Sequence, residues 1–99
     1  MGEFSISRER IERYLALTAE ALEKVEIPAV AGSDARAQAE DMLGMARAYH
    51  SDAQHFLAAG RGDDAFAAVN YAHGWLDAGV RLGLLDGKGD WKLFTQDCR

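Results

Sequence analysis

The stretch that decides the fold is DDAFAAVNYAHGWLDAGVRL, residues 63–82. Small and apolar side chains recur in it at steps of three and four residues, the period of one face of an α-helix. Tyr71, Trp75 and Leu82 widen this apolar arc on one side, and Val80 widens it on the other. We therefore expect a helix that contacts two neighbours at once, with these residues at the centre of its apolar arc: Ala65, Ala68, Val69, Ala72, Leu76 and Gly79.

The boundaries of this helix follow from the residues around it. Asp63 is the expected N-cap, because an aspartate side chain accepts hydrogen bonds from the free amide groups of the first turn. Gly83 suits the left-handed position after the last turn, and Gly60 suits the same position at the end of the preceding helix. The short reversal at 60–62 predicts that the two helices are antiparallel neighbours.

The preceding helix is expected to begin after a cap at Ser33 or Asp34 and to reach Ala59, a length of about 37–40 Å at ~1.5 Å per residue. Its apolar positions also follow the helical period. They are Ala35, Gln38, Ala39, Met42, Met45, Ala46, Tyr49, Ala53, Phe56 and Leu57.

A third periodic segment opens the chain, from about Ser7 to Glu26. Ser7 is the expected N-cap, and Pro28 stops the helix because proline has no N–H and disfavours helical geometry at the residue before it. The apolar positions of this segment are Ile11, Tyr14, Leu15, Thr18, Ala21, Leu22 and Val25.

Three such stripes predict an all-α fold, a three-helix up-and-down bundle with a long second helix, over residues 1–85. The C-terminal tail, residues 86–99, is too short to form a domain of its own. It is either frayed or folded back so that Trp91 and Phe94 cover the bundle, and we favour the docked form.

Composition narrows the function classes. The chain has 99 residues, 48% of them hydrophobic and 27% charged, which fits one folded domain and excludes a disordered chain. The net charge of −5 argues against a general nucleic-acid binder, which needs clustered lysine and arginine. No apolar run approaches the ~18–20 residues that span a bilayer, so we expect no membrane partner. The single cysteine, Cys98, leaves no internal disulfide and no cysteine metal cage, which favours a cytoplasmic setting.

The most informative polar cluster lies on one side of the helix at 63–82 and consists of Asn70, His73, Asp77 and Arg81. Asp77 is four residues from both His73 and Arg81, so its carboxylate can hydrogen-bond either side chain. The cluster is either a solvent-facing ladder of ion pairs or the polar wall of a site.

Folding the hairpin brings Asp52 level with Asn70 and adds it to the cluster. We expect Asp52 to clamp the two helices through a nearby donor, with a catalytic acid or metal ligand as the alternative. His50 and His55 would be further ligands, but they point to different sides of their helix and no His-Glu-x-x-His run is present. We therefore assign no catalytic residue, no metal site and no cofactor.

A strip of small residues, Ala67, Gly74 and Ala78, lies opposite the apolar arc. Glycine within a helix costs ~1 kcal/mol relative to alanine, so this strip indicates the close approach of another backbone or else a tolerated surface glycine. The docked tail and a second subunit are the two candidates for that backbone.

Residues 45–57 (MARAYHSDAQHFL), Gly60 and residues 65–84 together resemble an archaeal family catalogued as domain of unknown function 357. The resemblance implies a three-helix up-and-down bundle and brings no established activity. The family pattern includes the positions of Tyr49, Asp52, Tyr71, Gly74, Trp75, Asp77 and Arg81.

Three function classes remain. The first is a non-enzymatic adaptor or self-associating interaction module, with a homodimer or an unidentified protein as its assembly. The second is a small-ligand or metal-binding module, with or without catalysis, on the polar face of the helix at 63–82. The third is a nucleic-acid-associated bundle, which the acidic charge disfavours.

Overall fold

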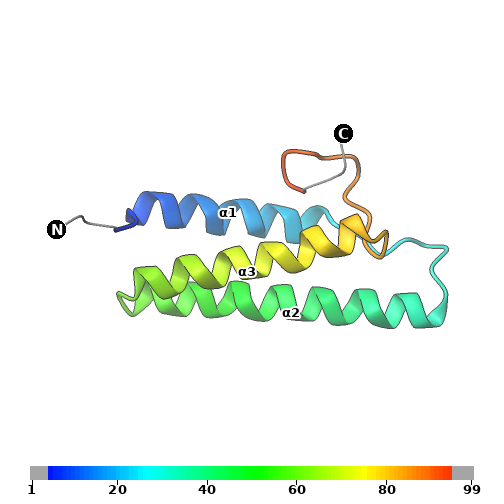
Figure 1. Cartoon of the computed structure of the whole chain (residues 1–99), viewed down its shortest axis with the longest axis horizontal. Helices are drawn as coiled ribbons and strands as arrows, with labels where there is room; N and C mark the ends of the chain where they lie inside the picture. Colours follow the sequence, from blue (N-terminus) through cyan, green and yellow to red (C-terminus); the bar gives the residue numbers. More distant parts are fainter. Residues whose placement is uncertain (1–4, 95–99) are drawn as a thin grey trace.

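A computed structural model describes residues 5–94 of the chain, and three helices account for most of this part. They are α1 (Arg8–Lys24), α2 (Ser33–Ala58) and α3 (Gly62–Arg81). The helices run up, down and up, so that α1 and α3 are parallel and α2 is antiparallel to both (Figure 1). The prediction of an all-α fold with a long second helix is confirmed.

The N-cap prediction is confirmed only for α1. The Ser7 hydroxyl accepts a hydrogen bond from the Arg10 amide at 3.1 Å, as a serine N-cap does. The N-caps of α2 and α3 are Gly32 and Arg61, neither of which makes a side-chain cap bond. The predicted caps are wrong by one or two residues, because Ser33, Asp34 and Asp63 lie inside the first turns. The two aspartates there still favour the positive end of the helix dipole.

Helix α1 ends at Lys24, two residues earlier than predicted. Val25 is extended (φ −68°, ψ 143°). Glu26 and Asp86 then exchange backbone hydrogen bonds of 3.1 and 2.7 Å in an isolated antiparallel bridge. The backbone groups of Glu26 therefore bond to the tail instead of continuing the helix. Pro28, the predicted stop, lies in the connection after this bridge.

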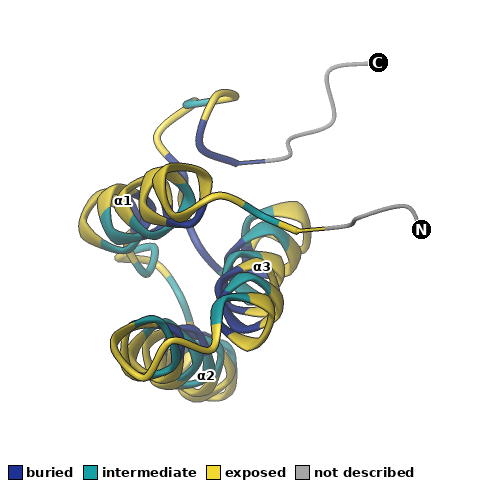
Figure 2. Cartoon of the chain, turned by 90° about the vertical axis from the view of Figure 1, so that its left-hand side faces the viewer, coloured by how far each residue is buried: buried dark blue, intermediate teal, exposed yellow. Residues whose placement is uncertain are grey.

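Helix α3 supplies much of the core. All six residues predicted at the centre of its arc are buried. Figure 2 shows the buried side of α3 turned toward α1 and α2, with exposed residues on its outward side. The predicted flank is partly wrong, because Tyr71 is 54% exposed and Leu82 is 69% exposed. On α2 the predicted stripe missed Leu43, which is buried among the core residues.

The tail folds back over the bundle beyond Gly83, whose φ of 77° is left-handed as predicted. Leu85, Leu93 and Phe94 are buried in the same core cluster as residues of all three helices. Trp91 is 68% exposed, so the expectation that it covers the bundle is wrong. Residues 95–99, including Cys98, lie outside the described residues.

Within residues 5–94, none of the helices combines the length and the apolar character needed to cross a bilayer.

Candidate functional site

A pocket of about 240 Å³ lies between α1 and α3, and the tail contributes one residue to it. We call it the α1–α3 pocket. Its wall is mixed, with an aromatic ring, an aliphatic side chain and several polar groups. The lining residues are Tyr14, Leu17, Thr18, Asn70, His73, Gly74, Asp77 and Lys92.

The pocket brings together three of the five residues of the predicted polar cluster: Asn70, His73 and Asp77. Arg81 is exposed at the last position of α3 and does not line it. Asp52 is exposed on α2, and none of its contacts within residues 5–94 is a hydrogen bond or ion pair. The predicted clamp is therefore wrong, because this exposed carboxylate has no donor on α3 among the described residues.

His73 is the most constrained side chain in the pocket. Its Nδ1 atom lies 3.0 Å from the Thr18 hydroxyl oxygen, and its Nε2 atom makes a short hydrogen bond with the Leu93 carbonyl oxygen. A carbonyl oxygen only accepts, so Nε2 carries the proton, and in the neutral ring Nδ1 accepts from Thr18. Both ring nitrogens are thus used to join α1, α3 and the tail.

Asp77 lies close to this ring without forming its main hydrogen bond. The Asp77 Oδ1 atom is 3.9 Å from the His73 Nε2 atom, and the two side chains are only 28% and 23% exposed. The contact between His73 and Asp77 that the i,i+4 spacing predicts is therefore present, but it is partly buried and does not face solvent. The Asn70 amide donates to the Phe66 carbonyl oxygen at 3.0 Å, one turn back on α3.

The other histidines do not extend the pocket into a metal site. The His50 Nε2 atom lies 2.9 Å from the Leu15 carbonyl oxygen and joins α2 to α1. His55 is exposed near the end of α2. Across residues 5–94, no three or more histidine, cysteine, aspartate or glutamate side chains are close enough to hold a metal ion.

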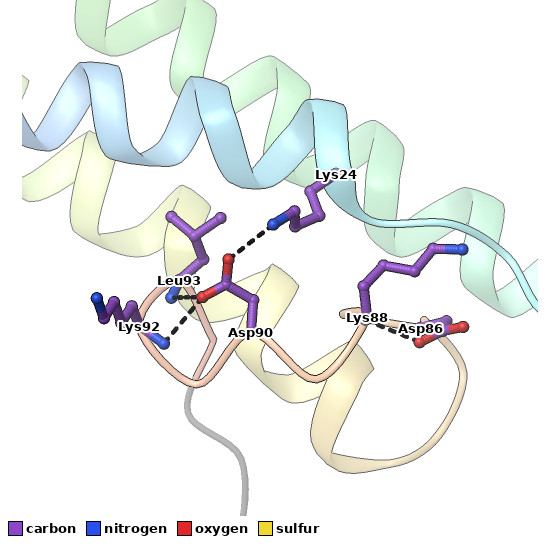
Figure 3. A network of polar contacts seen from close by, with 6 residues as sticks. All are labelled: Lys24, Asp86, Lys88, Asp90, Lys92 and Leu93. Carbon is purple, nitrogen blue, oxygen red and sulfur yellow. Dashed lines mark hydrogen bonds and ion pairs between the residues drawn. The ribbon is translucent and has the colours of Figure 1, made fainter.

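Two ion pairs fasten the tail to the end of α1. The Lys24 ammonium lies 2.9 Å from Asp90 Oδ2, and the Lys88 ammonium lies 2.7 Å from Glu26 Oε1. The other carboxylate oxygen of Asp90 accepts hydrogen bonds from the amides of residues 92 and 93, which closes the turn beside the pocket (Figure 3). The tail is therefore tied down by charge at the surface and by Leu93 and Phe94 beneath it.

These contacts shift two pKa values. The hydrogen bond from Lys24 is the largest cause that lowers the pKa of Asp90. The hydrogen bond to Glu26 is the largest cause that raises the pKa of Lys88. Both charged forms are favoured when the tail is docked.

The small-residue strip lies on the outward side of α3, where Ala67, Gly74 and Ala78 are exposed. Tyr71 and Leu82, also exposed, continue the same line at steps of four, three, four and four residues. We call these five residues the outer seam of α3. Exposed apolar side chains at this spacing are typical of a helix that packs against another helix.

Two hollows lie between the outer seam and α2, on either side of Tyr71. The Trp75 hollow, about 310 Å³, is formed by Met42, Tyr71, Gly74, Trp75 and Ala78. The Tyr49 hollow, about 470 Å³, is formed by Tyr49, Asp52, Phe56, Asp64, Ala67, Ala68 and Tyr71. The Tyr71 ring stands edge-on to Tyr49, with 4.5 Å between ring centroids. This contact holds the tyrosine upright between the hollows.

No contact within the described chain explains the glycine of the seam. A Cβ atom at Gly74 would meet nothing within 4 Å, and Gly44 on α2 is equally open. At Gly79 a Cβ atom would lie 2.5 Å from Leu85 Cδ1. The chain that follows α3 therefore packs along Gly79 through Leu85, and the described part of the tail leaves Gly74 open.

Comparison with known proteins gives a family and no activity. No curated protein and no solved structure matches the chain. Residues 13–85 match the model of a family described as "Protein of unknown function (DUF357)". This range contains α2, α3 and all of α1 after its first five residues. It also contains the whole outer seam and every residue that lines the α1–α3 pocket except Lys92. The chain belongs to the DUF357 family.

Proposed function

We propose that the protein is a non-enzymatic interaction module that binds a partner helix along the outer seam of α3. The observation that carries this proposal is the seam itself, five uncharged exposed residues at helix-packing spacing beside two hollows. Recognition of a helix in a groove uses anchors of this spacing.

The hydrogen bonds of His73 support a non-enzymatic role. A general base needs a free nitrogen within reach of the proton that it takes. Both nitrogens of His73 already hold Thr18 and the tail, so the ring acts as a structural link. A cytoplasmic location fits the single cysteine of the chain.

The proposal is tested by titrating the ¹⁵N-labelled protein with a synthetic amphipathic helical peptide that carries leucine and alanine at alternate seam positions. We expect amide shifts at Ala67, Gly74 and Ala78. The substitution Ala78→Glu should abolish them, and the same change at Ala48, exposed on α2, should not. Shifts confined to other surfaces, or equal shifts with a peptide that carries lysine at those positions, would contradict the proposal.

A second candidate function is the binding of a small zwitterion, such as a free amino acid, in the α1–α3 pocket. The pocket holds an acidic group, a basic group and an amide, from Asp77, Lys92 and Asn70, beside the apolar side chain of Leu17. Millimolar amino acids should shift the Asn70 amide, and Lys92→Ala should weaken that response. An unchanged spectrum with all twenty amino acids would remove this candidate.

A further inference from the structure

We infer that the partner helix on the outer seam is α3 of a second copy of this chain, packed antiparallel, with the two Gly74 residues at the crossing point. This inference rests on the proposed function and names its partner. Within the described residues, the other large exposed apolar side chains, Leu17, Val30 and Trp91, lie apart on α1, a connection and the tail. Single residues of this kind are ordinary on a surface. The seam is a continuous line.

The order of large and small residues in the seam is self-complementary. Tyr71 stands three residues before Gly74 and Ala78 four residues after it, so an antiparallel pair sets Tyr71 against Ala78 of the partner subunit. Ala67 and Leu82 stand seven before and eight after, and they pair in the same way. Each large side chain thus faces a small one, and the two-fold symmetry repeats each of these contacts once more across the interface.

Gly74 lies between these pairs, where two helix backbones approach most closely. Within residues 5–94, apart from the backbone of its own helix, nothing lies within 4 Å of the position that a Cβ atom would take. The ~1 kcal/mol that a helical glycine costs therefore has no compensating contact among the described residues. Contact with the second Gly74 supplies one.

The Trp75 hollow extends the match beyond the seam. Ala78 forms part of its wall, and its volume of about 310 Å³ gives space for an aromatic ring. In the antiparallel pair, Tyr71 of each copy enters the hollow beside Met42 and Trp75 of the other. Buried aromatic anchors in pockets dominate the binding energy of many interfaces.

A parallel pair in register does not fit the same residues. It would set Tyr71 against Tyr71 of the partner subunit, where two large rings crowd each other. It would also set Ala67 against Ala67 of the partner subunit, where two small side chains leave a void. In the antiparallel pair Asp77 comes level with Asn70 of the partner subunit, which has amide hydrogens to donate.

The orientation is tested by disulfide cross-linking of the full chain with Cys98→Ser, so that each variant carries one cysteine. Close approach at the crossing point places two residues within the Cα separation that a disulfide needs, about 4.4–6.8 Å. Gly74→Cys should give a covalent dimer under mild oxidation, and Gly44→Cys, an equally open helical glycine, should not. Ala67→Cys and Leu82→Cys should cross-link only when the two variants are mixed.

The outcomes distinguish failure of the antiparallel pair from failure of the proposed function, the binding of a partner helix along the outer seam. Cross-linking of Ala67→Cys alone and Leu82→Cys alone would show a parallel pair and overturn the inference. A one-chain mass by sedimentation equilibrium at millimolar concentration, with no Gly74→Cys dimer, would overturn it as well. If the peptide titration still shifts the seam in that case, the proposed function stands with another partner; if it does not, both fail.

Discussion

The Nδ1 atom of His73 lies 3.0 Å from the Thr18 hydroxyl oxygen, a contact between side chains 55 residues apart. Through its other nitrogen the same ring holds the Leu93 carbonyl oxygen, 20 residues ahead. One side chain therefore links α1, α3 and the tail at the edge of the α1–α3 pocket.

Thr18→Val should destabilise the protein by about 1 kcal/mol, because valine keeps the volume but leaves the Nδ1 atom of His73 without its hydrogen-bond partner. Thr18→Ser keeps the hydroxyl group and removes a methyl group from a side chain that is 2% exposed. Urea denaturation measures both variants. If valine matched the wild type, the Thr18 contact would carry no stability.

The neutral His73 ring should be the Nε2–H tautomer, because Nε2 faces a carbonyl oxygen that only accepts. Long-range ¹H–¹⁵N correlation spectra near pH 8 distinguish the two tautomers. A proton on Nδ1 would mean that the tail is not held by this ring.

Substitution by alanine should change the stability of the protein in opposite directions at two glycines of α3. Gly74→Ala should stabilise the monomer by about 1 kcal/mol, because its Cβ atom meets no neighbour and alanine is the better helix former. Gly79→Ala forces a Cβ atom against Leu85, and overpacking costs about 1–3 kcal/mol. The melting temperatures of the two variants, recorded at low concentration, should diverge. Equal temperatures would contradict the close packing of the tail on Gly79.

Docking of the tail should weaken at both extremes of pH. The pKa of Asp90 is lowered from 3.8 by the Lys24 hydrogen bond, so its contribution is present above that value and is lost as the pH falls through the lower, folded pKa. The pKa of Lys88 is raised from 10.5 by the Glu26 hydrogen bond, so its contribution is present below 10.5 and is lost as the pH rises through the higher, folded pKa. The methyl shifts of Leu93 report docking.

Asp90→Asn is the control for the loss of tail docking at low pH. An amide has no charge to lose, so the variant should show weaker docking at neutral pH and a flatter response as the pH falls below 3.8. An unchanged acid response in the variant would assign it to another carboxyl group.

Salt should strengthen self-association. Each chain carries a net charge of −5, and the proposed contact is uncharged at its centre, so two copies repel at long range and attract through apolar surface. Raising the ionic strength shortens the Debye length from about 30 Å at 0.01 M to about 8 Å at 0.15 M. The dimer fraction from sedimentation should rise over this range. A fall would indicate an interface made by ion pairs.

The sequence by itself determined the helices and the buried side of α3. The helical period is a local property, carried by residues three and four apart, so the six core positions from Ala65 to Gly79 could be predicted and are buried. The serine cap of α1 and the left-handed Gly83 are equally local, because each depends on one residue and its immediate neighbours.

The tertiary structure alone decided which flank of that apolar arc is covered and where the polar side chains bind. Tyr71 and Leu82 continue the periodic pattern, yet they stay 54% and 69% exposed, and that depends on how three helices are placed around one core. His73 has Asp77 within its own helix, but its ring bonds to Thr18 and Leu93. The end of α1 at Lys24 depends on pairing of Glu26 with a segment 60 residues away. Contacts at such separations leave no period in a sequence, because they exist only once the chain has folded.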